Sequence, residues 1–312
     1  MKVLAPILVL FIIFSGCAGE QATEWQPVPR ESMIPADAVK VLPEDDNYPS
    51  QMHSDGWGQP VPLAGPVNTA GAEDSPFMTT DDRFFFFFTP DVRVPVEKQI
   101  LDNVTGMYYS KKKGDLWSRP ERVYLTEPGK LSLDGCQYVH GNEMLFCSAR
   151  EGYTGVNLFT ATFKDGNWTD WQPVDEILKT YEVGEMHIHG DELYFHSPRA
   201  GGKGGYDIWM TRNVDGEWQE PVNIDIVNSE DTDGWPYITE DGNELWFTRT
   251  YMGSPGIFRS VKEGGEWSEP ELVISQFAGE PTLDSEGNIY FVHHFYRDGE
   301  MIEADIYVAY KK

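Results

Sequence analysis

The sequence predicts an all-β fold, a five-bladed β-propeller with four antiparallel strands in each blade. The first observation is a repeat, because tryptophans recur every 49 to 60 residues, at Trp57, Trp117, Trp168, Trp218 and Trp267. The second is a shared phrase, in which a glycine precedes each tryptophan and a proline follows it. The third is the material between the tryptophans, where short aromatic segments alternate with Gly, Asn and Asp turns, as is typical of strands.

The predicted strands follow one order within each repeat. The first strand opens at an Asp-Gly or Gly-Glu step, at Asp134-Gly135, Gly184-Glu185, Asp233-Gly234 and Gly279-Glu280. The second strands are expected at 84–88, 144–147, 193–195, 245–248 and 289–292, and the third at 106–109, 157–159, 207–209, 256–258 and 305–307. The segment around each tryptophan is expected to supply the fourth strand.

The two ends of the repeat region complement each other. The last repeat ends at Lys312 without its tryptophan segment, whereas the folded region opens at Trp57 with a tryptophan segment that has no repeat before it. We therefore expect the segment from Trp57 to Val67 to be the outer strand of the last blade and to close the ring, which leaves no open edge between the first and last blades.

The N-terminus predicts an exported protein. Met1 and Lys2 are followed by an apolar run up to Phe14 and then by Ser15-Gly16-Cys17, a layout typical of a signal peptide. The last residues of this run resemble a lipoprotein box, which implies a signal peptide over 1–16 and a lipid on Cys17, with plain secretion or an uncleaved anchor as alternatives. Residues 17–54, rich in Pro and acidic residues, are expected to be a flexible tether, and residues 55–312 the propeller.

The charge of the chain limits its partners. The 51 acidic and 24 basic residues give a net charge of −27, which argues against nucleic-acid binding and against direct adhesion to anionic lipid. Contact with the membrane is therefore expected through the lipid alone, with the protein facing the periplasm or the cell exterior.

One repeat carries a family resemblance. The segment from Leu193 to Trp209, with Ser197-Pro198-Arg199 and Tyr206-Asp207 inside it, resembles the WD40-like repeats of the Tol-system periplasmic protein and of many exported lipoproteins. The resemblance covers about residues 55–312 and implies a propeller outside the cytoplasm, but no particular ligand. The chain departs from the pattern at 90–105, an insertion in the first blade, and at Arg249, two residues earlier in its strand than Arg199.

Acidic residues recur at the start of the first strands, which line the channel of a propeller. The expected ring of carboxylates consists of Asp74, Asp134, Glu185, Asp233 and Glu280. As a trio, Asp74, Asp134 and Glu185 offer an enzymatic interpretation, because glycosidases use paired carboxylates as acid and base or nucleophile. The alternative is that Asp before Gly is a turn residue encoded by the repeat.

Two further sets of side chains admit two interpretations each. Glu185, His187, His189 and His196 are expected on one face of the third blade, where they are either metal ligands or packing residues between blades. Cys136 and Cys147 are expected opposite each other on paired strands, either as a disulfide or as two small buried thiols.

Two classes of function follow. The favoured hypothesis is a binding or scaffold module for a protein or a cell-envelope polysaccharide, with Glu185, Trp235, Glu280 and the insertion at 90–105 at the binding mouth. Trp235 is singled out because it places an aromatic ring next to carboxylates at a channel-facing position. The alternative is a glycoside-acting enzyme that uses the channel carboxylates. No cofactor is expected for either function.

Overall fold

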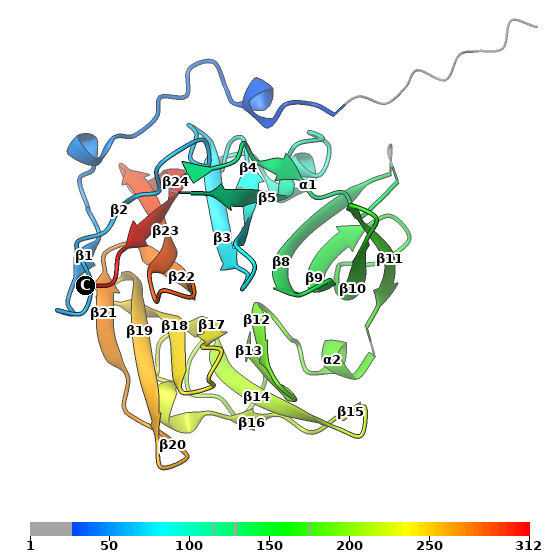
Figure 1. The fold of residues 1–312 in the computed structure, drawn as a ribbon, viewed down its shortest axis with the longest axis vertical. Helices are drawn as coiled ribbons and strands as arrows, with labels where there is room; N and C mark the ends of the chain where they lie inside the picture. Colours follow the sequence, from blue (N-terminus) through cyan, green and yellow to red (C-terminus); the bar gives the residue numbers. More distant parts are fainter. Residues whose placement is uncertain (1–26, 115, 128–129, 175) are drawn as a thin grey trace, which may run out of the picture.

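The computed structural model describes residues 27–312 except for 115, 128–129 and 175, so the predicted signal peptide and Cys17 lie outside the described residues. The described part is nearly all-β, with antiparallel sheets arranged around a common centre in a propeller-like manner (Figure 1). No helix in that part is long and apolar enough to cross a membrane.

The strands form five antiparallel runs along the chain, which we call run 1 to run 5. Run 1 contains β3 (Ala72–Met78), β4 (Arg83–Thr89), β5 (Gly106–Lys113), β6 (Leu116–Trp117) and β7 (Glu121–Arg122). Run 2 contains β8 (Ser132–His140), β9 (Glu143–Arg150), β10 (Val156–Lys164) and β11 (Asn167–Pro173). Run 3 contains β12 (Met186–His189), β13 (Glu192–Ser197), β14 (Asp207–Val214), β15 (Glu217–Trp218) and β16 (Val222–Asn223).

The last two runs follow the same order. Run 4 contains β17 (Asp233–Ile238), β18 (Glu244–Tyr251), β19 (Ser254–Glu263), β20 (Glu266–Trp267) and β21 (Glu271–Ser275). Run 5 contains β22 (Ala278–Leu283), β23 (Ile289–Arg297) and β24 (Glu300–Ala309). The short helices are α1 (Val96–Gln99), α2 (Glu176–Thr180), η1 (Arg30–Met33), η2 (Pro43–Asp45) and η3 (Asp225–Val227). In Figure 1 the first strand of each run faces the centre.

The N-terminal part of the chain meets the C-terminal strand. β2 (Val61–Pro62) pairs antiparallel with β24, with Val61 opposite Val308, and a separate bridge joins Trp57 to Lys311. β24 also makes one parallel pair with β3, between Ala304 and Ala72, so that runs 1 and 5 belong to one nine-stranded sheet. The segment around Trp57 therefore lies beside the last run, where the sequence predicted it.

Proline interrupts most of the predicted fourth strands. In runs 1, 3 and 4 the tryptophan segment forms two short strands separated by Pro120, Pro221 or Pro270, because proline has no backbone N–H for the sheet. Run 2 has the continuous strand β11 with a register shift instead.

Aromatic side chains fill the space between neighbouring runs. Phe85 of run 1 and Phe146 and Trp168 of run 2 belong to one buried cluster, and the rings of Phe85 and Trp168 lie 6.3 Å apart. Trp57, from the N-terminal part of the chain, contacts Trp246 of run 4 edge to face, with ring centres 5.4 Å apart. The repeated tryptophans at 57, 117 and 168 are thus buried packing residues rather than exposed ligand-binding rings.

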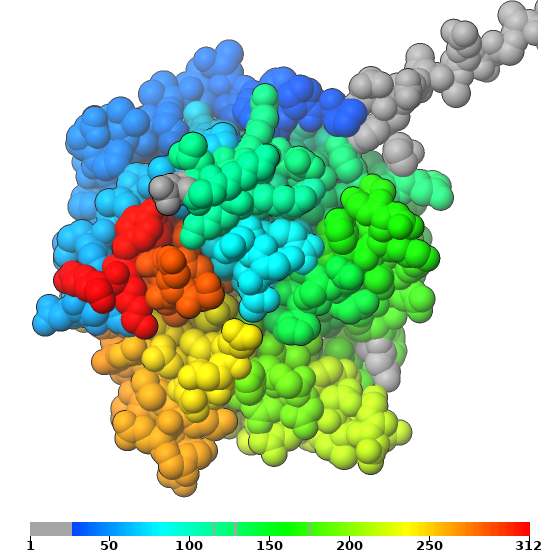
Figure 2. Space-filling model, viewed as in Figure 1, coloured from blue at the N-terminus to red at the C-terminus, as the bar shows by residue number. Residues whose placement is uncertain are grey.

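The segment before the sheets differs from the expected flexible tether. From residue 30 onward it lies against the sheets, along the edge of the molecule (Figure 2). Arg30 is 3% exposed and donates to Glu73 at 3.0 Å, Lys40 forms ion pairs with Glu303 and Asp305, and Asp46 accepts from His293 at 2.8 Å. β1 (Gln51–Met52) adds a strand to run 4. The tether prediction over 17–54 is therefore wrong for residues 30–53, because single buried charges and one strand anchor a segment that has no hydrophobic period.

Candidate functional site at one end of the channel

The first strands share a distorted residue near their start. Ser75, Cys136, Trp235 and Glu280 have φ values of 48°, 52°, 51° and 56°, and each lies in a register shift between the first and second strands of its run. A left-handed conformation is unfavourable for residues other than glycine. Four such residues at matching places therefore indicate a β-bulge that recurs in the runs. Glu185 stands at the matching place in run 3, just before β12.

These residues surround one small cavity. Ser75, Glu185, Trp235 and Glu280 line it at its polar end, and Phe77 and Tyr237 contribute to its apolar wall. Its volume is about 40 Å³, far below that of a usual small-molecule pocket. None of the described residues lining it is a lysine or arginine.

The insertion at 90–105 leaves the sheet at the same end. It connects β4 to β5 and includes α1, and the last residue of β4, Thr89, pairs with Ala72, the first residue of β3. Asp102 holds the end of the insertion by accepting from the backbone N–H groups of Val104 and Thr105 at 2.8 and 2.7 Å.

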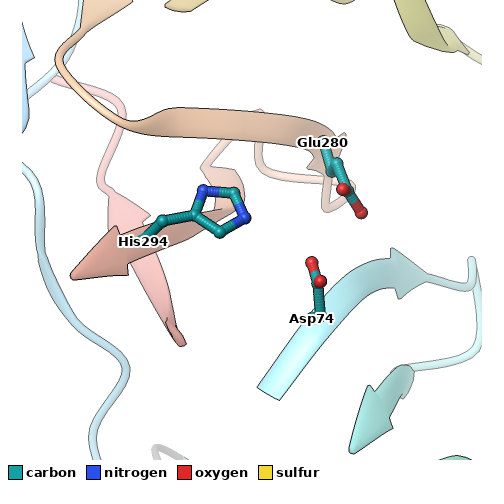
Figure 3. A group of neighbouring side chains, drawn as sticks. All are labelled: Asp74, Glu280 and His294. Carbon is teal, nitrogen blue, oxygen red and sulfur yellow. The ribbon is translucent and has the colours of Figure 1, made fainter. Parts of the chain in front are cut away.

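Two carboxylates with raised pKa values, Glu185 and Glu280, lie at this end beside Asp74. Burial and the nearby Cys136 and Asp74 raise the pKa of Glu185 well above its usual range. Burial, together with Asp74 and Glu185, does the same to the pKa of Glu280. The carboxylates of Asp74 and Glu280 point toward each other in Figure 3, with the ring of His294 beside them. These three side chains have ligand atoms that all lie within 4.8 Å of one another.

His294 was not anticipated from the sequence. It follows His293 on β23, a second strand, whereas the sequence directed attention to the first strands. Its Nδ1 lies 3.3 Å from the carbonyl oxygen of Phe277, and burial lowers its pKa, which favours the neutral ring. The adjacent pair of histidines in the last repeat was the only sequence signal that pointed to it.

The structure separates the acidic residues that the sequence grouped into one ring. Asp134 is buried and accepts from Arg150 and Ser148, both at 2.6 Å, and Asp233 accepts from Arg249 at 2.6 Å. The residue that matches them in run 1 is Glu73, which pairs with Arg30, so Asp74 matches the glycines at 135 and 234 instead. Of the predicted catalytic trio, Asp74 and Glu185 lie at the cavity end, whereas Asp134 is engaged in an ion pair within its own run.

The predicted histidine cluster of run 3 does not come together as a metal site. His187 packs against the rings of Phe77, Tyr138 and Tyr237, and burial lowers its pKa to about 3. His189 points elsewhere and contacts the carbonyl oxygen of Glu240 at 3.1 Å.

The fourth member of that cluster, His196, contacts Trp235, with ring centres 5.0 Å apart. Its Nδ1 accepts from the backbone N–H of Trp235 at 3.2 Å, and burial lowers its pKa to about 4. The expected pairing of His187 with Tyr194 is present, but His187 is packed among the rings of Phe77, Tyr138 and Tyr237. These two histidines have the packing role that was the alternative to metal binding.

Cys136 and Cys147 are free cysteines in the structure. Because Cys136 occupies the register shift, Gly135 rather than Cys136 pairs directly with Cys147. The two side chains are still neighbours, and the contact with Cys147 and burial raise the pKa of Cys136 well above its usual range. The carboxylate of Glu185 is a further neighbour of the Cys136 thiol.

Comparison with known proteins gives distant structural likenesses. No family model and no curated protein matches the sequence. The TolB structure from Acinetobacter baumannii aligns with a TM-score of 0.43 and 11% identity, over 79% of this chain and 56% of that one. The chain therefore spans little more than half the length of TolB.

Two solved structures described as hydrolases are similarly distant. A putative hydrolase from Bacteroides ovatus aligns with a TM-score of 0.45 and 13% identity, over 88% of this chain and 97% of that one. A GH43 glycoside hydrolase, described as having endo-xylanase and exo-arabinofuranosidase activity, aligns with a TM-score of 0.45 and 11% identity, over 80% of this chain and 51% of that one. These likenesses assign no activity to this protein.

Proposed function

We propose that this protein is a lipid-anchored, extracytoplasmic five-bladed propeller that binds a partner where Glu185, Trp235 and Glu280 meet. The observation that carries the proposal is that one cavity collects these three side chains from three different runs. Each is partly exposed, so each is available to a partner at the mouth. A site assembled from several blades at one channel end suits recognition of another molecule.

The five-bladed architecture and its closure are part of this proposal. Five antiparallel runs, each with its first strand toward the centre, correspond to five blades. The pairing of β2 with β24 supplies the outer strand that run 5 lacks, and it supports closure of the ring by the N-terminal segment.

The location of the protein is proposed from its sequence. The apolar run up to Phe14 and the following Cys17 support export and lipidation. An acyl anchor requires no membrane-spanning helix in the mature protein. Twelve residues, 18–29, separate Cys17 from Arg30, which is the first buried residue in the part of the chain that the structure describes.

The chemistry of the mouth favours a protein partner with a basic segment. No described lysine or arginine lines the cavity, and the whole chain has a net charge of −27, so a basic group of a partner would favour the ionised forms of Glu185 and Glu280, which burial disfavours in the free protein. Trp235 adds an aromatic ring, on which a lysine or arginine side chain can stack. A cell-envelope polysaccharide is the other partner that an aromatic ring beside carboxylates suits.

A glycoside-acting enzyme is the second candidate function. The observation that favours it is the raised pKa of Glu185 and Glu280 beside Asp74, since a general acid needs a raised pKa. Two observations count against it: the cavity of about 40 Å³ is far below the volume of a usual small-molecule pocket, and Asp134 is held by Arg150.

A direct test presents the full-length protein, in detergent, to arrays of basic peptides, acidic peptides and envelope glycans, and to chromogenic glycosides. We expect binding to basic peptides without glycoside turnover. Combining Trp235→Ala with Glu185→Gln is expected to weaken that binding at least tenfold, which corresponds to about 1.4 kcal/mol.

The matched control is Trp171→Ala, which removes another partly exposed tryptophan, on β11 of run 2 and outside the cavity. It should leave binding unchanged. Equal binding by the double variant and the wild type would refute the site assignment. Glycoside turnover that Glu185→Gln abolishes would establish the enzymatic alternative.

A further inference from the structure

We propose that Asp74, Glu280 and His294 bind one divalent transition-metal ion, of the Mn²⁺ or Zn²⁺ type, at the end of the channel. The site deepens the proposed function, because Glu280 belongs to both, but its test uses the metal alone. The two proposals therefore fail separately.

The three side chains converge from three strands. Asp74 comes from β3 of run 1, and Glu280 and His294 come from β22 and β23 of run 5, so the site spans the junction between the first and last runs (Figure 3). Their ligand atoms lie within 4.8 Å of one another. Ligands about 2.1 Å from a shared ion lie up to about 4.2 Å apart, so small side-chain movements complete the coordination.

The carboxylates here lack the basic partners that other buried carboxylates of this protein have. Glu73 pairs with Arg30, Asp134 with Arg150, and Asp233 with Arg249. At the channel end, by contrast, Asp74, Glu185 and Glu280 adjoin a cavity that no described lysine or arginine lines. A divalent cation supplies the missing positive charge.

One carboxylate oxygen of Glu280 is available to coordinate a metal ion. Its Oε2 is buried and has no hydrogen-bond partner among the described residues. Leaving a buried carboxylate oxygen unpaired is costly, and unpaired atoms of this kind are rare in native structures. A metal ion next to Asp74 would coordinate this oxygen. Glu280 also has a left-handed backbone conformation, with a φ of 56°.

The histidine is oriented as metal-binding histidines usually are. The carbonyl oxygen of Phe277 only accepts hydrogen bonds, so its contact with Nδ1 of His294 at 3.3 Å places the ring proton on Nδ1. Nε2 then carries the free lone pair, and Figure 3 shows this side of the ring turned toward Asp74 and Glu280. Histidines that bind metals commonly donate the proton of their other ring nitrogen to a backbone carbonyl in this way, which fixes the orientation of the ring.

The donor set selects the class of metal. One imidazole nitrogen and two carboxylates suit Mn²⁺ and Zn²⁺, whereas Ca²⁺ and Mg²⁺ prefer oxygen ligands alone. Three protein ligands leave coordination positions open toward the cavity, where water, the third carboxylate Glu185, or an anionic group of a partner can complete the shell.

The test is a titration of the full-length protein in detergent, freed of metal by a chelator and dialysis, with MnCl₂ and ZnCl₂. Calorimetry and the electron paramagnetic resonance signal of free Mn²⁺ report the bound fraction. We expect one tight site in each chain. Asp74→Asn, Glu280→Gln and His294→Gln should each weaken its affinity at least tenfold.

The matched control variants remove a carboxylate or an imidazole that lies outside the proposed metal site. Glu217→Gln changes an exposed carboxylate on β15, and His189→Gln changes a histidine outside the cluster, so both should bind metal as the wild type does. Weak, multiple binding that the three ligand variants do not alter would overturn the proposal, since it would reflect the acidic surface. Binding of Ca²⁺ with no tight site for Mn²⁺ or Zn²⁺ would also overturn it.

Thermal unfolding separates loss of the site from loss of the fold. In metal-free buffer Glu280→Gln should melt at or above the wild-type temperature, because it removes a carboxyl group whose ionised form is disfavoured by burial, Asp74 and Glu185. Added Mn²⁺ should raise the melting temperature of the wild type and of Glu217→Gln, but not that of Glu280→Gln. An equal rise in all three proteins would place the metal elsewhere.

Discussion

Arg30 donates a hydrogen bond to Glu73 at 3.0 Å, and both side chains are almost fully buried. In runs 2 and 4 the matching acids, Asp134 and Asp233, pair with arginines of their own run. Run 1 instead takes its arginine from the N-terminal segment. That arginine also lies over the ring of Phe88, with its guanidinium carbon 4.9 Å from the ring centre. The segment is thus an integral part of the fold.

Replacing Arg30 should destabilise the protein strongly. Arg30→Ala leaves Glu73 buried without its cation, and breaking a buried pair in this way costs about 3 to 5 kcal/mol. Burial raises the pKa of Glu73 to about 7 even beside Arg30. Glu73 can therefore take up a proton when Arg30 is removed, and the loss of stability is then expected near the lower end of this range. Urea denaturation followed by tryptophan fluorescence measures the loss.

The comparison variant for Arg30 is Arg119→Ala. Its guanidinium is 75% exposed and bonds Glu31 at 3.2 Å, so its removal should cost well under about 1 kcal/mol. Equal losses for the two variants would show that the N-terminal segment does not anchor run 1.

Gly184 lies where a larger residue has no room. A Cβ atom at this position would stand 2.2 Å from Nε2 of His196. His196 is buried and bonded to the backbone of Trp235, so it has little freedom to move aside. Gly184→Ala should therefore lower the free energy of unfolding by about 1 to 3 kcal/mol, measured by chemical denaturation.

A glycine with ordinary surroundings provides the control. At Gly58 a Cβ atom would be 3.6 Å from the nearest atom, the carbonyl oxygen of Tyr310, and its φ lies outside the left-handed region. Gly58→Ala should leave stability nearly unchanged. A Gly184→Ala protein as stable as Gly58→Ala would mean that His196 is free to rearrange.

The strand order was predictable because the repeat imposes it. Each expected second and third strand overlaps an observed one, since a phrase with fixed tryptophan and turn positions leaves little choice of register. The N-terminal segment was not predictable in the same way. Its anchors at Arg30, Lys40 and Asp46 are single residues without a period, and their partners are distant in the sequence.

The candidate site was only partly predictable for a related reason. Glu185, Trp235 and Glu280, which were grouped because they occupy matching positions in the repeat, all line the cavity. The matching of Asp74 to Asp134 was wrong by one residue, because the acid of run 1 is Glu73 and the register shift is invisible in the sequence. His294 was missed because it lies outside the repeated pattern.

The thiol of Cys136 should react slowly. The attacking species is the thiolate, and the contact with Cys147 and burial keep the pKa of Cys136 well above its usual range. We expect maleimide at pH 7 to label the peptides of Cys136 and Cys147 only after unfolding in urea, as read by mass spectrometry. Peptides that stay unlabelled after unfolding, and become labelled on reduction, would show that the two cysteines form the disulfide instead.

Acid should destabilise the protein through His187. Burial among aromatic rings lowers its pKa to about 3 in the folded state, from 6.5 without burial, so the unfolded chain binds more protons between these values. Stability is then lost as the pH falls below about 6.5, by about 2 kcal/mol at pH 5 from this residue. His187→Phe should remove the part of this dependence that His187 contributes, because Nδ1 of His187 has no hydrogen-bond partner to lose, and should leave the part due to His196, whose pKa burial lowers to about 4. His140→Phe, at an exposed position, should keep the whole dependence. Free energies of unfolding measured from pH 4 to 7 decide the matter, and equal slopes for the wild type and His187→Phe would exclude His187 as the source.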